Sequence, residues 1–336
     1  MKIAIHHRKG SFSERWIDYC NQNNINYVLV NAFDNNFIQE VISCDAFLWH
    51  FRHGEIKDEI LAKHILFALE HSGVKIFPNF KTAWHFDDKV AQKYLLEALQ
   101  IPLVPSFVFY DKNSAKTWLS KTTFPKVFKL KGGAGSANVK LVNNYNDALS
   151  LVKIAFGKGF KQFDGWDYFK DTFKKYLSKT KTTKDLIKSF FRIFMSTNYS
   201  IRKGRERDYV YFQDFIPENE FDIRVVVVSG KAFAIKRMNR KNDFRASGSG
   251  EIIYDETCFN IETIELALKI NVLIQTQCCA MDFIYQDNQP LLVEISYGFS
   301  MEGYDKCTGY WDQNLHFHKG NFNPYAWIIK DLLPIN

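Results

Sequence analysis

AMDFIYQDNQPLLVEIS (residues 280–296) consists of two apolar segments on either side of a polar turn, and this pattern predicts a β-hairpin. With residues 286–290 as the loop, Asp282 lies directly opposite Glu294, and facing residues share one face of the ladder. Both strands are otherwise apolar, so two like charges stand opposite one another on a partly buried surface, which destabilises a hairpin. A hard divalent cation at this point of the hairpin resolves the conflict.

We therefore predict a metal site on this face of the hairpin. Mg²⁺, for which Mn²⁺ can substitute, is typically held by one or two carboxylates together with substrate phosphates. Asp282 and Glu294 supply the carboxylates, and Ser296, two residues further, points to the same face. The alternative is a solvent-facing acidic rim with lysine partners elsewhere.

The residues before this hairpin predict further strands and helices. The expected elements, in chain order, are a helix over 85–100, a strand over 101–111, a strand pair over 125–142, a strand, linker and hairpin over 211–238 with its turn at Ser229-Gly230, and a helix over 261–277.

The first eighty residues alternate apolar strand patterns with helical ones. Strands are expected over 1–5, 26–31, 45–50 and 74–79, and a helix over 55–73. This alternation indicates a small, mostly parallel, doubly wound sheet, in which ligands bind beyond the carboxyl ends of the strands. Two polar clusters follow such ends, at residues 6–8 and 50–53. They form either a wall that faces substrate or ordinary surface loops.

Composition and charge limit the class of protein. Of the 336 residues, 46% are hydrophobic and 16% aromatic, which excludes a disordered chain. No apolar stretch reaches a membrane span, and the first residues do not resemble a signal peptide. The 6 cysteines form no CxxC pair, so we expect free thiols and a cytoplasmic protein. The net charge of +7 is concentrated in residues 157–207.

A glycine-rich turn lies inside the strand pair over 125–142. Gly133, Gly135 and Ser136 would let backbone N–H groups approach phosphate oxygens, with Lys129 projecting beside them. The segment is neither a Walker A motif nor a dinucleotide-binding fingerprint. A simple hairpin turn is the alternative.

A run of basic residues follows the hairpin over 211–238. Four of its cations, within ten residues, precede small residues that do not obstruct a ligand: Lys236, Arg237, Arg240 and Arg245. Arginine forks match phosphoryl and carboxylate oxygens. The run is either an anion site or a solvated loop.

Taken in order, five of these segments resemble the ATP-grasp enzymes, most closely the branch of glutamate-adding carboxylate–amine ligases. The segments are residues 87–106, 126–139, 212–228, 236–250 and 280–296. The resemblance implies an α/β and α+β protein with the ATP-grasp fold: a doubly wound pre-ATP-grasp domain over 1–80, then an ATP-grasp domain of two lobes over 81–336 that carries an insertion over 157–207.

The resemblance also implies roles for individual residues, all in binding ATP and Mg²⁺ or in catalysis. Lys89 and Lys129 would contact ATP phosphates; Asp214 and the backbone of Phe215 would lie along adenine; Asp222 would lie near the ribose; Arg245 and Ser247 would lie at the triphosphate; and Asp282 and Glu294 would bind Mg²⁺. With Arg245, Lys236 and Arg237 are the expected catalytic cations. The family usually has Asn where this chain has Ser296, so water would complete the coordination of the second metal ion.

The activity so implied is the joining of a carboxylate to an amine through an acyl phosphate, with ADP as product. Both substrates would be small molecules. Residues 294–327 resemble the ends of ATP-grasp proteins of bacterial surface-polysaccharide pathways, which implies a lipid-linked or nucleotide-linked sugar acid. Two alternatives stay open: an ATP-binding module without catalysis that docks at a membrane complex, and a carboxylate or sugar kinase.

The insertion over 157–207 contains two basic amphipathic helical patterns. Over 165–177 and 185–195, aromatic and aliphatic residues recur on one face, with lysines elsewhere. Such helices act at a membrane surface or on a partner, which would place the protein at the inner surface of the membrane. The alternative is a lid packed on the protein itself. A nucleic acid is the least expected partner, because no recognised nucleic-acid module is present.

Overall fold

The computed structural model forms two compact units. It describes residues 2–132, 138–161, 165–177, 182–194, 204–240, 243–245 and 250–333. Unit 1 contains Met1–His53, Lys57–Val104 and Ile216–Asn336, and unit 2 contains Gly54–Ile56 and Pro105–Phe215.

The first sheet of unit 1 is the parallel sheet that the N-terminal sequence predicts. Its strands lie in the order β2-β1-β3-β4 and are β1 (Lys2–His6), β2 (Asn26–Val30), β3 (Ala46–Trp49) and β4 (Lys75–Phe77). The helices of this part are α1 (Phe12–Gln22), α2 (Phe37–Val41), α3 (Ile56–His71) and α4 (Phe80–Ala83). The predicted strands and the helix over 55–73 are confirmed. The chain order reverses between β1 and β3, where sheets of this type bind ligands.

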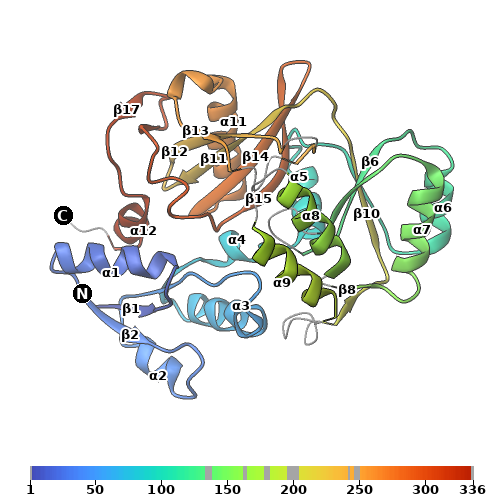
Figure 1. Ribbon diagram of the computed structural model, residues 1–336. Coiled ribbons are helices and arrows are strands. Elements are labelled where there is room, and N and C mark those ends of the chain that lie inside the picture. The colour runs from blue at the N-terminus through green and yellow to red at the C-terminus, as the bar shows by residue number, and fades with distance from the viewer. Residues whose placement is uncertain are drawn as a thin grey trace. The chain divides into compact units, whose positions relative to one another are not determined.

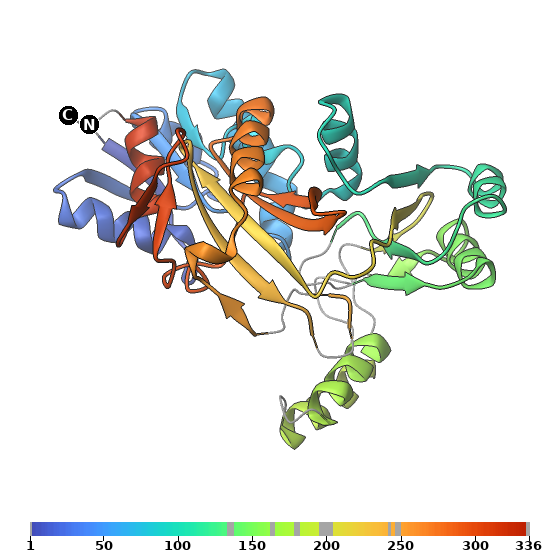
Figure 2. The same ribbon diagram turned by 90° about the horizontal axis from the view of Figure 1, so that it is seen from above.

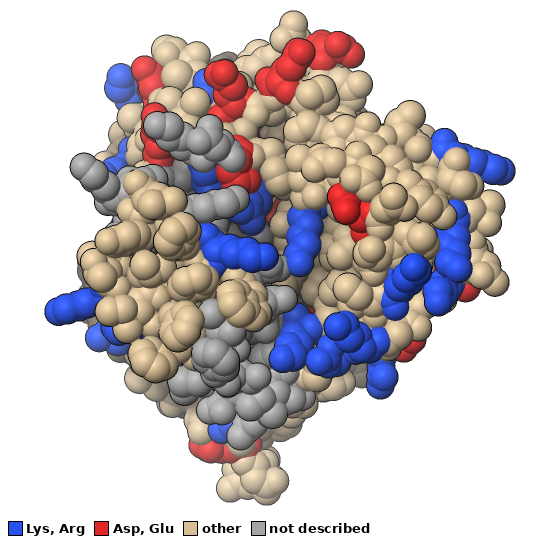
Figure 3. Space-filling view, turned by 45° about the vertical axis from the view of Figure 1, so that its right-hand side comes forward, with Lys and Arg blue, Asp and Glu red and all other residues tan. Residues whose placement is uncertain are grey.

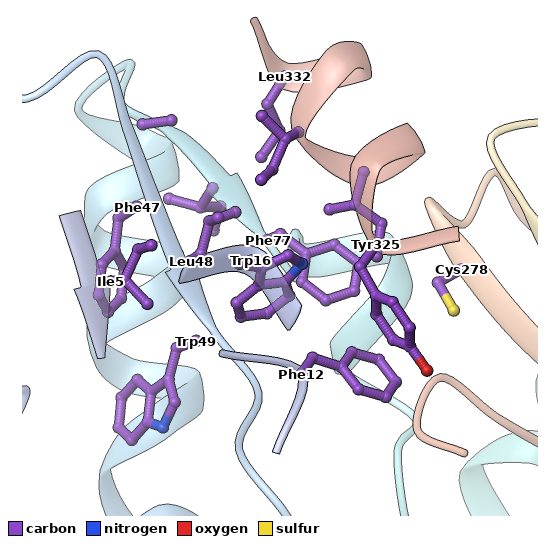
Figure 4. Close-up of a cluster of buried hydrophobic side chains, with 14 of the residues drawn as sticks. Ile5, Phe12, Trp16, Phe47, Leu48, Trp49, Phe77, Cys278, Tyr325 and Leu332 are labelled. Carbon is purple, nitrogen blue, oxygen red and sulfur yellow. The ribbon is translucent and has the colours of Figure 1, made fainter. Parts of the chain in front are cut away.

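The core of this sheet also includes the end of the chain. Helix α12 (Pro324–Leu332) lies beside α1, although they are far apart in the sequence (Figure 1). Phe12 and Trp16 of α1 are fully buried, and the Phe12 ring centroid lies 5.1 Å from that of Tyr325 in α12 (Figure 4). Cys278, from the second sheet, belongs to the same cluster. One hydrophobic core therefore joins the N-terminal sheet, α12 and the second sheet.

The second sheet of unit 1 carries the deciding hairpin. Its main path is β15-β14-β11-β12-β16-β17, and β13 pairs with β12. The strands are β11 (Phe221–Val228), β12 (Lys231–Met238), β13 (Ile252–Ile253), β14 (Cys278–Gln286), β15 (Gln289–Ser296), β16 (Gly309–Trp311) and β17 (Phe317–Lys319). Helix α11 (Ile261–Ile274) packs on it, after the short 3-10 helix η1 (Glu256–Cys258). Ser229 and Gly230 both have positive φ and form the predicted turn.

The hairpin is confirmed, but its predicted loop over 286–290 is wrong. β14 and β15 continue to Gln286 and Gln289, and the turn is only Asp287-Asn288, both with positive φ. This is the two-residue turn that matches the twist of the strands. The shorter turn shifts the pairing by one residue, but a β-bulge at Val293, between the Phe283–Leu292 and Asp282–Glu294 pairs, shifts it back. Asp282 therefore faces Glu294 as predicted.

The helix predicted over 85–100 begins later, as α5 (Lys89–Ala98). The Asp88 carboxylate accepts hydrogen bonds from the N–H groups of Val90 and Ala91, which fixes the helix start. Asp87, just before the cap, has a φ of 56° and cannot continue a helix backwards. Lys89 is consequently the first helical residue.

Unit 2 contains a four-stranded sheet in the order β5-β10-β6-β7. The strands are β5 (Ser106–Phe109), β6 (Lys126–Lys129), β7 (Val139–Val142) and β10 (Val210–Asp214), and β8 (Phe160–Lys161) pairs with β9 (Arg205–Glu206). Helices α6 (Lys112–Leu119) and α7 (Tyr145–Ala155) pack on one face around Phe128 and Phe212. The insertion forms α8 (Gly165–Leu177) and α9 (Thr183–Phe194).

Candidate functional site

Asp282 is held by two arginines in the centre of the second sheet. Arg224 approaches it through both Nε and Nη2, the latter 2.5 Å from Oδ2. Nη2 of Arg237 lies 2.9 Å from the same Oδ2. The side chain of Asp282 is 8% exposed and that of Arg237 is 9% exposed. The positive charge beside this buried carboxylate therefore comes from the protein itself.

The ion pairs continue across three neighbouring strands. Arg237 also binds Asp222, with Nε to Oδ1 at 2.6 Å and Nη2 to Oδ2 at 2.5 Å. The strand register explains this row, since Asp222 faces Arg237 between β11 and β12, and Arg224 faces Asp282 between β11 and β14. Asp222 and Arg224 are two residues apart and so share one face of β11. Acid and base alternate along the row.

The row shifts the pKa values of its two acids in opposite directions. Burial opposes ionisation of Asp282, but the attraction of Arg224 and Arg237 outweighs it and holds its pKa well below the usual range. Asp222 has the opposite balance. Burial and then repulsion by Asp282 raise its pKa to about 6, although Arg237 opposes the shift. Asp282 is consequently the charged partner that both arginines share.

Glu294 is more open to solvent than Asp282. Its side chain is 35% exposed, and Nζ of Lys89 lies 3.6 Å from its Oε2. Ser296 lies on the same face of the hairpin, but its hydroxyl donates to the carbonyl of Gly298 at 2.9 Å and accepts from the Gly298 N–H at 3.2 Å. The metal ligands predicted from the sequence thus share one face, with Glu294 the most accessible.

The predicted anion-binding cations occupy different surroundings. Nζ of Lys236 lies 3.8 Å from the centre of the Phe221 ring. Arg245 forms a pair with Asp243, Nη2 to Oδ2 at 2.5 Å. Arg237 is turned into the row of ion pairs. Ser247 lies outside the described residues, as do Gly133, Gly135 and Ser136 of the glycine-rich turn.

In unit 2, Lys129 lies on the face of the sheet opposite the core around Phe128. Its Nζ donates to Oε1 of Gln213 at 2.6 Å, and both side chains are buried. Gln213 in turn donates to the hydroxyl of Ser106 at 3.0 Å, and Tyr211 donates to the same hydroxyl at 2.9 Å. This face therefore presents a fixed lysine within a polar network.

The residues predicted along adenine lie at the end of β10. The Asp214 carboxylate accepts from Nζ of Lys126 at 2.5 Å, and Lys126 is buried between this acid and the rings of Phe107 and Trp118. Phe215 follows directly, as the last residue of unit 2. Asp214 is thus held in place at the point where the chain leaves the unit.

Some residues of the two polar clusters, at 6–8 and 50–53, pack against the N-terminal core. The Arg8 guanidinium donates to Asp58 at 2.7 Å and to the carbonyl of His50 at 3.0 Å. The His50 ring stacks on Phe12 and accepts the Phe12 N–H at 3.1 Å. Burial, and then the charges of Arg8 and Arg52, lower the pKa of His50 to about 3. His7 and Arg52 of the same clusters are exposed, so the clusters are packed only in part.

His53, Glu59 and Asp87 form a further cluster that the sequence did not indicate. One ligand atom of each lies within 4.8 Å of the others, and Nδ1 of His53 contacts Asp87. Four further residues were not expected from the sequence: Arg224, Gln213, Tyr211 and Ser106. The alternation of side chains along a strand could have indicated Arg224, because it lies two residues from Asp222 and so shares a face with it. It also lies opposite Asp282 on the neighbouring strand.

Basic side chains outnumber acidic ones on the face of the molecule in Figure 3, as the net charge of the chain leads one to expect. Lys and Arg side chains spread over its middle and right, whereas Asp and Glu side chains gather mainly near its top (Figure 3). A surface with this excess of cations attracts anions.

Comparisons with known proteins relate this geometry to one fold. Residues 187–313 match the model of the RimK-like ATP-grasp domain, which is less than half of the chain. No curated protein sequence matches. Three solved structures resemble the chain over nearly its whole length. The D-alanine–D-alanine ligase of Bacillus anthracis complexed with ATP has a TM-score of 0.58 and 14% identity, and the match covers 99% of this chain and 95% of that one. A RimK domain ATP-grasp protein of Sphaerobacter thermophilus has a TM-score of 0.56 and 15% identity, with 99% of both chains covered. The biotin carboxylase domain of the Hydrogenobacter thermophilus 2-oxoglutarate carboxylase with MgADP has a TM-score of 0.59 and 13% identity, with 98% of this chain and 69% of that one covered. The chain has the ATP-grasp fold.

Proposed function

We propose that this chain is an ATP- and Mg²⁺-dependent carboxylate–amine ligase that works through an acyl phosphate. The observation that carries the proposal is the Asp282–Glu294 pair, two acids on one face of a hairpin in a protein with the ATP-grasp fold. Solved proteins of the same fold hold ATP or MgADP, which supports the choice of nucleotide and metal.

The residues at the hairpin fit a magnesium ion. Carboxylate and hydroxyl oxygens are its preferred ligands. Glu294 is partly exposed, with Lys89 at 3.6 Å as its cation. A carboxylate has about four lone-pair sites, and Arg224 and Arg237 occupy three of those on Asp282. One site on Asp282 remains for a metal, so Glu294 would be the main ligand and Asp282 the second.

The reaction requires two substitutions. A substrate carboxylate oxygen attacks the γ-phosphorus of ATP, and ADP leaves. The amine then attacks the carbonyl carbon of the acyl phosphate, phosphate leaves, and the amine loses a proton. Bound Mg²⁺ would neutralise charge between the phosphates during the first step.

The protein itself would hold the substrate carboxylate and the γ-phosphate in the orientation that the attack requires, and would stabilise the charge that develops. We assign Lys89 and Lys129 to the phosphates, and Lys236 and Arg245 to the transferring phosphoryl group and the acid. Arg237 is a positioning residue, because it holds Asp282 and Asp222 in place.

The adenosine end would be bound by Asp214, Phe215 and Asp222. We extend the phosphate site to Gly133, Gly135, Ser136 and Ser247 on the sequence pattern alone. Residues 81–336 would perform this chemistry, and residues 1–80 would form the N-terminal domain that precedes them in the chain.

For the substrate, we propose a sugar acid of a surface polysaccharide, carried by a lipid or a nucleotide, to which an amino acid or amine is attached. The resemblance of residues 294–327 to such proteins supports this choice. Among the described residues, no helix has the length and apolarity that a membrane crossing requires.

The test is product analysis. The protein, ATP, Mg²⁺ and panels of uronic acids and amines should give ADP, phosphate and an amide; AMP and pyrophosphate as sole products would refute the proposal. Glu294→Gln should abolish turnover, and Glu265→Gln, a change of the same chemistry on the exposed surface of α11, should not.

One observation favours a second function, an ATP-binding module without catalysis. Both oxygens of Asp282 are already bound by arginines, and the Ser296 hydroxyl is used by Gly298. Such a module binds ATP but forms no product with any acid–amine pair. Turnover that Glu294→Gln abolishes while ATP binding persists would exclude it.

A further inference from the structure

Helices α8 and α9 form a hairpin whose two members lie against one another (Figure 2). Among the side chains of these helices that the structure describes, the buried ones are Thr172 and Ser189, which are small. Each hydroxyl is satisfied within its own helix, Thr172 by the carbonyl of Tyr168 at 2.9 Å and Ser189 by that of Leu186 at 2.7 Å. Neither hydroxyl therefore needs a partner outside its own helix.

Of the large apolar side chains described on α8 and α9, six are exposed. Their exposed fractions are 56% for Trp166, 44% for Phe173, 66% for Leu177, 53% for Ile187, 47% for Phe190 and 60% for Phe191. The rings form one continuous surface, since Phe169 lies 6.3 Å from Trp166 and 5.9 Å from Phe190 on the other helix, between centroids. A contiguous apolar surface of this kind marks an interaction site.

Positive charge surrounds this apolar surface. Over residues 165–194 the sequence has eight Lys and Arg against three Asp and Glu. The exposed cations include Lys170, Lys184, Lys188 and Arg192. The guanidinium of Arg192 lies 5.3 Å from the centre of the Tyr168 ring, so charge and apolar surface are directly adjacent. The surface is therefore complementary to one that is anionic outside and apolar beneath.

We propose that the α8–α9 hairpin docks in the interface of a bilayer rich in anionic phospholipid. Short amphipathic helices with aromatic and aliphatic side chains on one side and Lys or Arg around them lie in the plane of the headgroups. The aliphatic Leu177 and Ile187 suit acyl chains but do not stack on bases, which favours lipid over single-stranded nucleic acid. A lid would bury these side chains, whereas here they are exposed.

This inference is independent of the proposed reaction, so each can fail alone. Membrane binding is measured by co-sedimentation of the full chain with vesicles of equal parts phosphatidylcholine and phosphatidylglycerol, and with vesicles of phosphatidylcholine alone. We expect binding to the anionic vesicles only, and weaker binding as salt screens the cations. Absence of binding to anionic vesicles, or equal binding to neutral ones, would overturn the proposal.

Two variants separate the apolar and the electrostatic parts. Phe173→Ser with Phe191→Ser should weaken binding at least about tenfold, because acyl contact is lost. Lys184→Gln with Lys188→Gln should weaken it roughly thirtyfold, at about 1 kcal/mol for each cation near the surface. The matched control is Val272→Ser with Leu273→Ser on α11, whose side chains are 74% and 52% exposed. An effect of the control as large as that of the hairpin variants contradicts the assignment.

A spectroscopic measurement locates the contact. Brominated lipids quench tryptophans that enter the acyl region, so Trp166→Phe should reduce the quenched fraction of the fluorescence while vesicle binding persists. Unchanged quenching would place the contact elsewhere in the chain. Capture of single-stranded RNA without vesicle binding, or a raised KM for ATP as the only effect of the hairpin variants, would support the nucleic-acid and lid alternatives and overturn the lipid proposal.

Discussion

Replacing Asp282 by Asn should destabilise unit 1 by about 3 kcal/mol, the lower end of the cost of breaking a buried ion pair. The change keeps the shape of the side chain but removes the charge that Arg224 and Arg237 share. Arg237 keeps Asp222 as a partner. The loss therefore falls on Arg224, whose side chain is 20% exposed and has no other acid within salt-bridge distance among the described residues.

The assay is urea unfolding, followed by the fluorescence of the buried tryptophans of unit 1 in the presence of EDTA, so that metal binding does not contribute. The companion variant is Arg224→Met. In that background Asp282→Asn should cost clearly less than in the wild type, because no unpaired guanidinium remains. A loss below about 1 kcal/mol for Asp282→Asn, or strict additivity of the two changes, would refute the interpretation of the row as a coupled unit.

Four further predictions follow from single contacts. Because His50 is neutral when folded, it should lower the free energy of unfolding by about 1.4 kcal/mol per pH unit as pH drops from 6.5 towards 3; the buried His85 adds to the total fall, which should be smaller in His50→Gln. Gly309→Ala should cost about 1–3 kcal/mol by overpacking, since a Cβ there would lie 2.3 Å from the His318 carbonyl oxygen, as thermal unfolding would show. Lys129→Met should weaken ATP binding about tenfold or more by calorimetry. Glu294→Gln should remove the effect of Mg²⁺ on ATP affinity.

The histidine and the lysine predictions each have a matched control. His71→Gln changes an exposed histidine and should leave the pH profile as in the wild type; a parallel change in both variants would mean that His50 is not the titrating group. Lys140→Met, on the neighbouring strand β7, tests whether any lost cation weakens ATP binding. Equal losses for the two lysine variants contradict a specific role for Lys129.

For the β14–β15 hairpin, the turn was predicted wrongly, but the pairing of Asp282 with Glu294 was predicted correctly. Its loop was predicted from polar composition, but the strands run three residues further, because Asp287-Asn288 alone can make the turn. The bulge at Val293 then restores the register. No sequence rule used here predicts a bulge, and the predicted pairing of Asp282 with Glu294 therefore depended on two deviations that cancel.

The charge argument was incomplete in a different way. Like charges opposite one another do require compensation, but most of the compensation at Asp282 comes from Arg224 and Arg237. Those cations reach it across strands that are adjacent only in the folded sheet. The polar network of Lys129, Gln213 and Ser106 likewise joins strands that are about a hundred residues apart in the sequence. Such partners depend on topology, which strand patterns do not determine.

Because α12 completes the core that β1 and α1 begin, the order of synthesis and the order of folding differ. A ribosome releases the first sheet long before Tyr325 is made, so Phe12 can contact Trp16 and His50 early but meets Tyr325 only when the last helix has emerged. Until α12 is synthesised, the apolar surface of α1 that it covers is exposed to solvent. Exposed apolar surface of this kind is what chaperones bind.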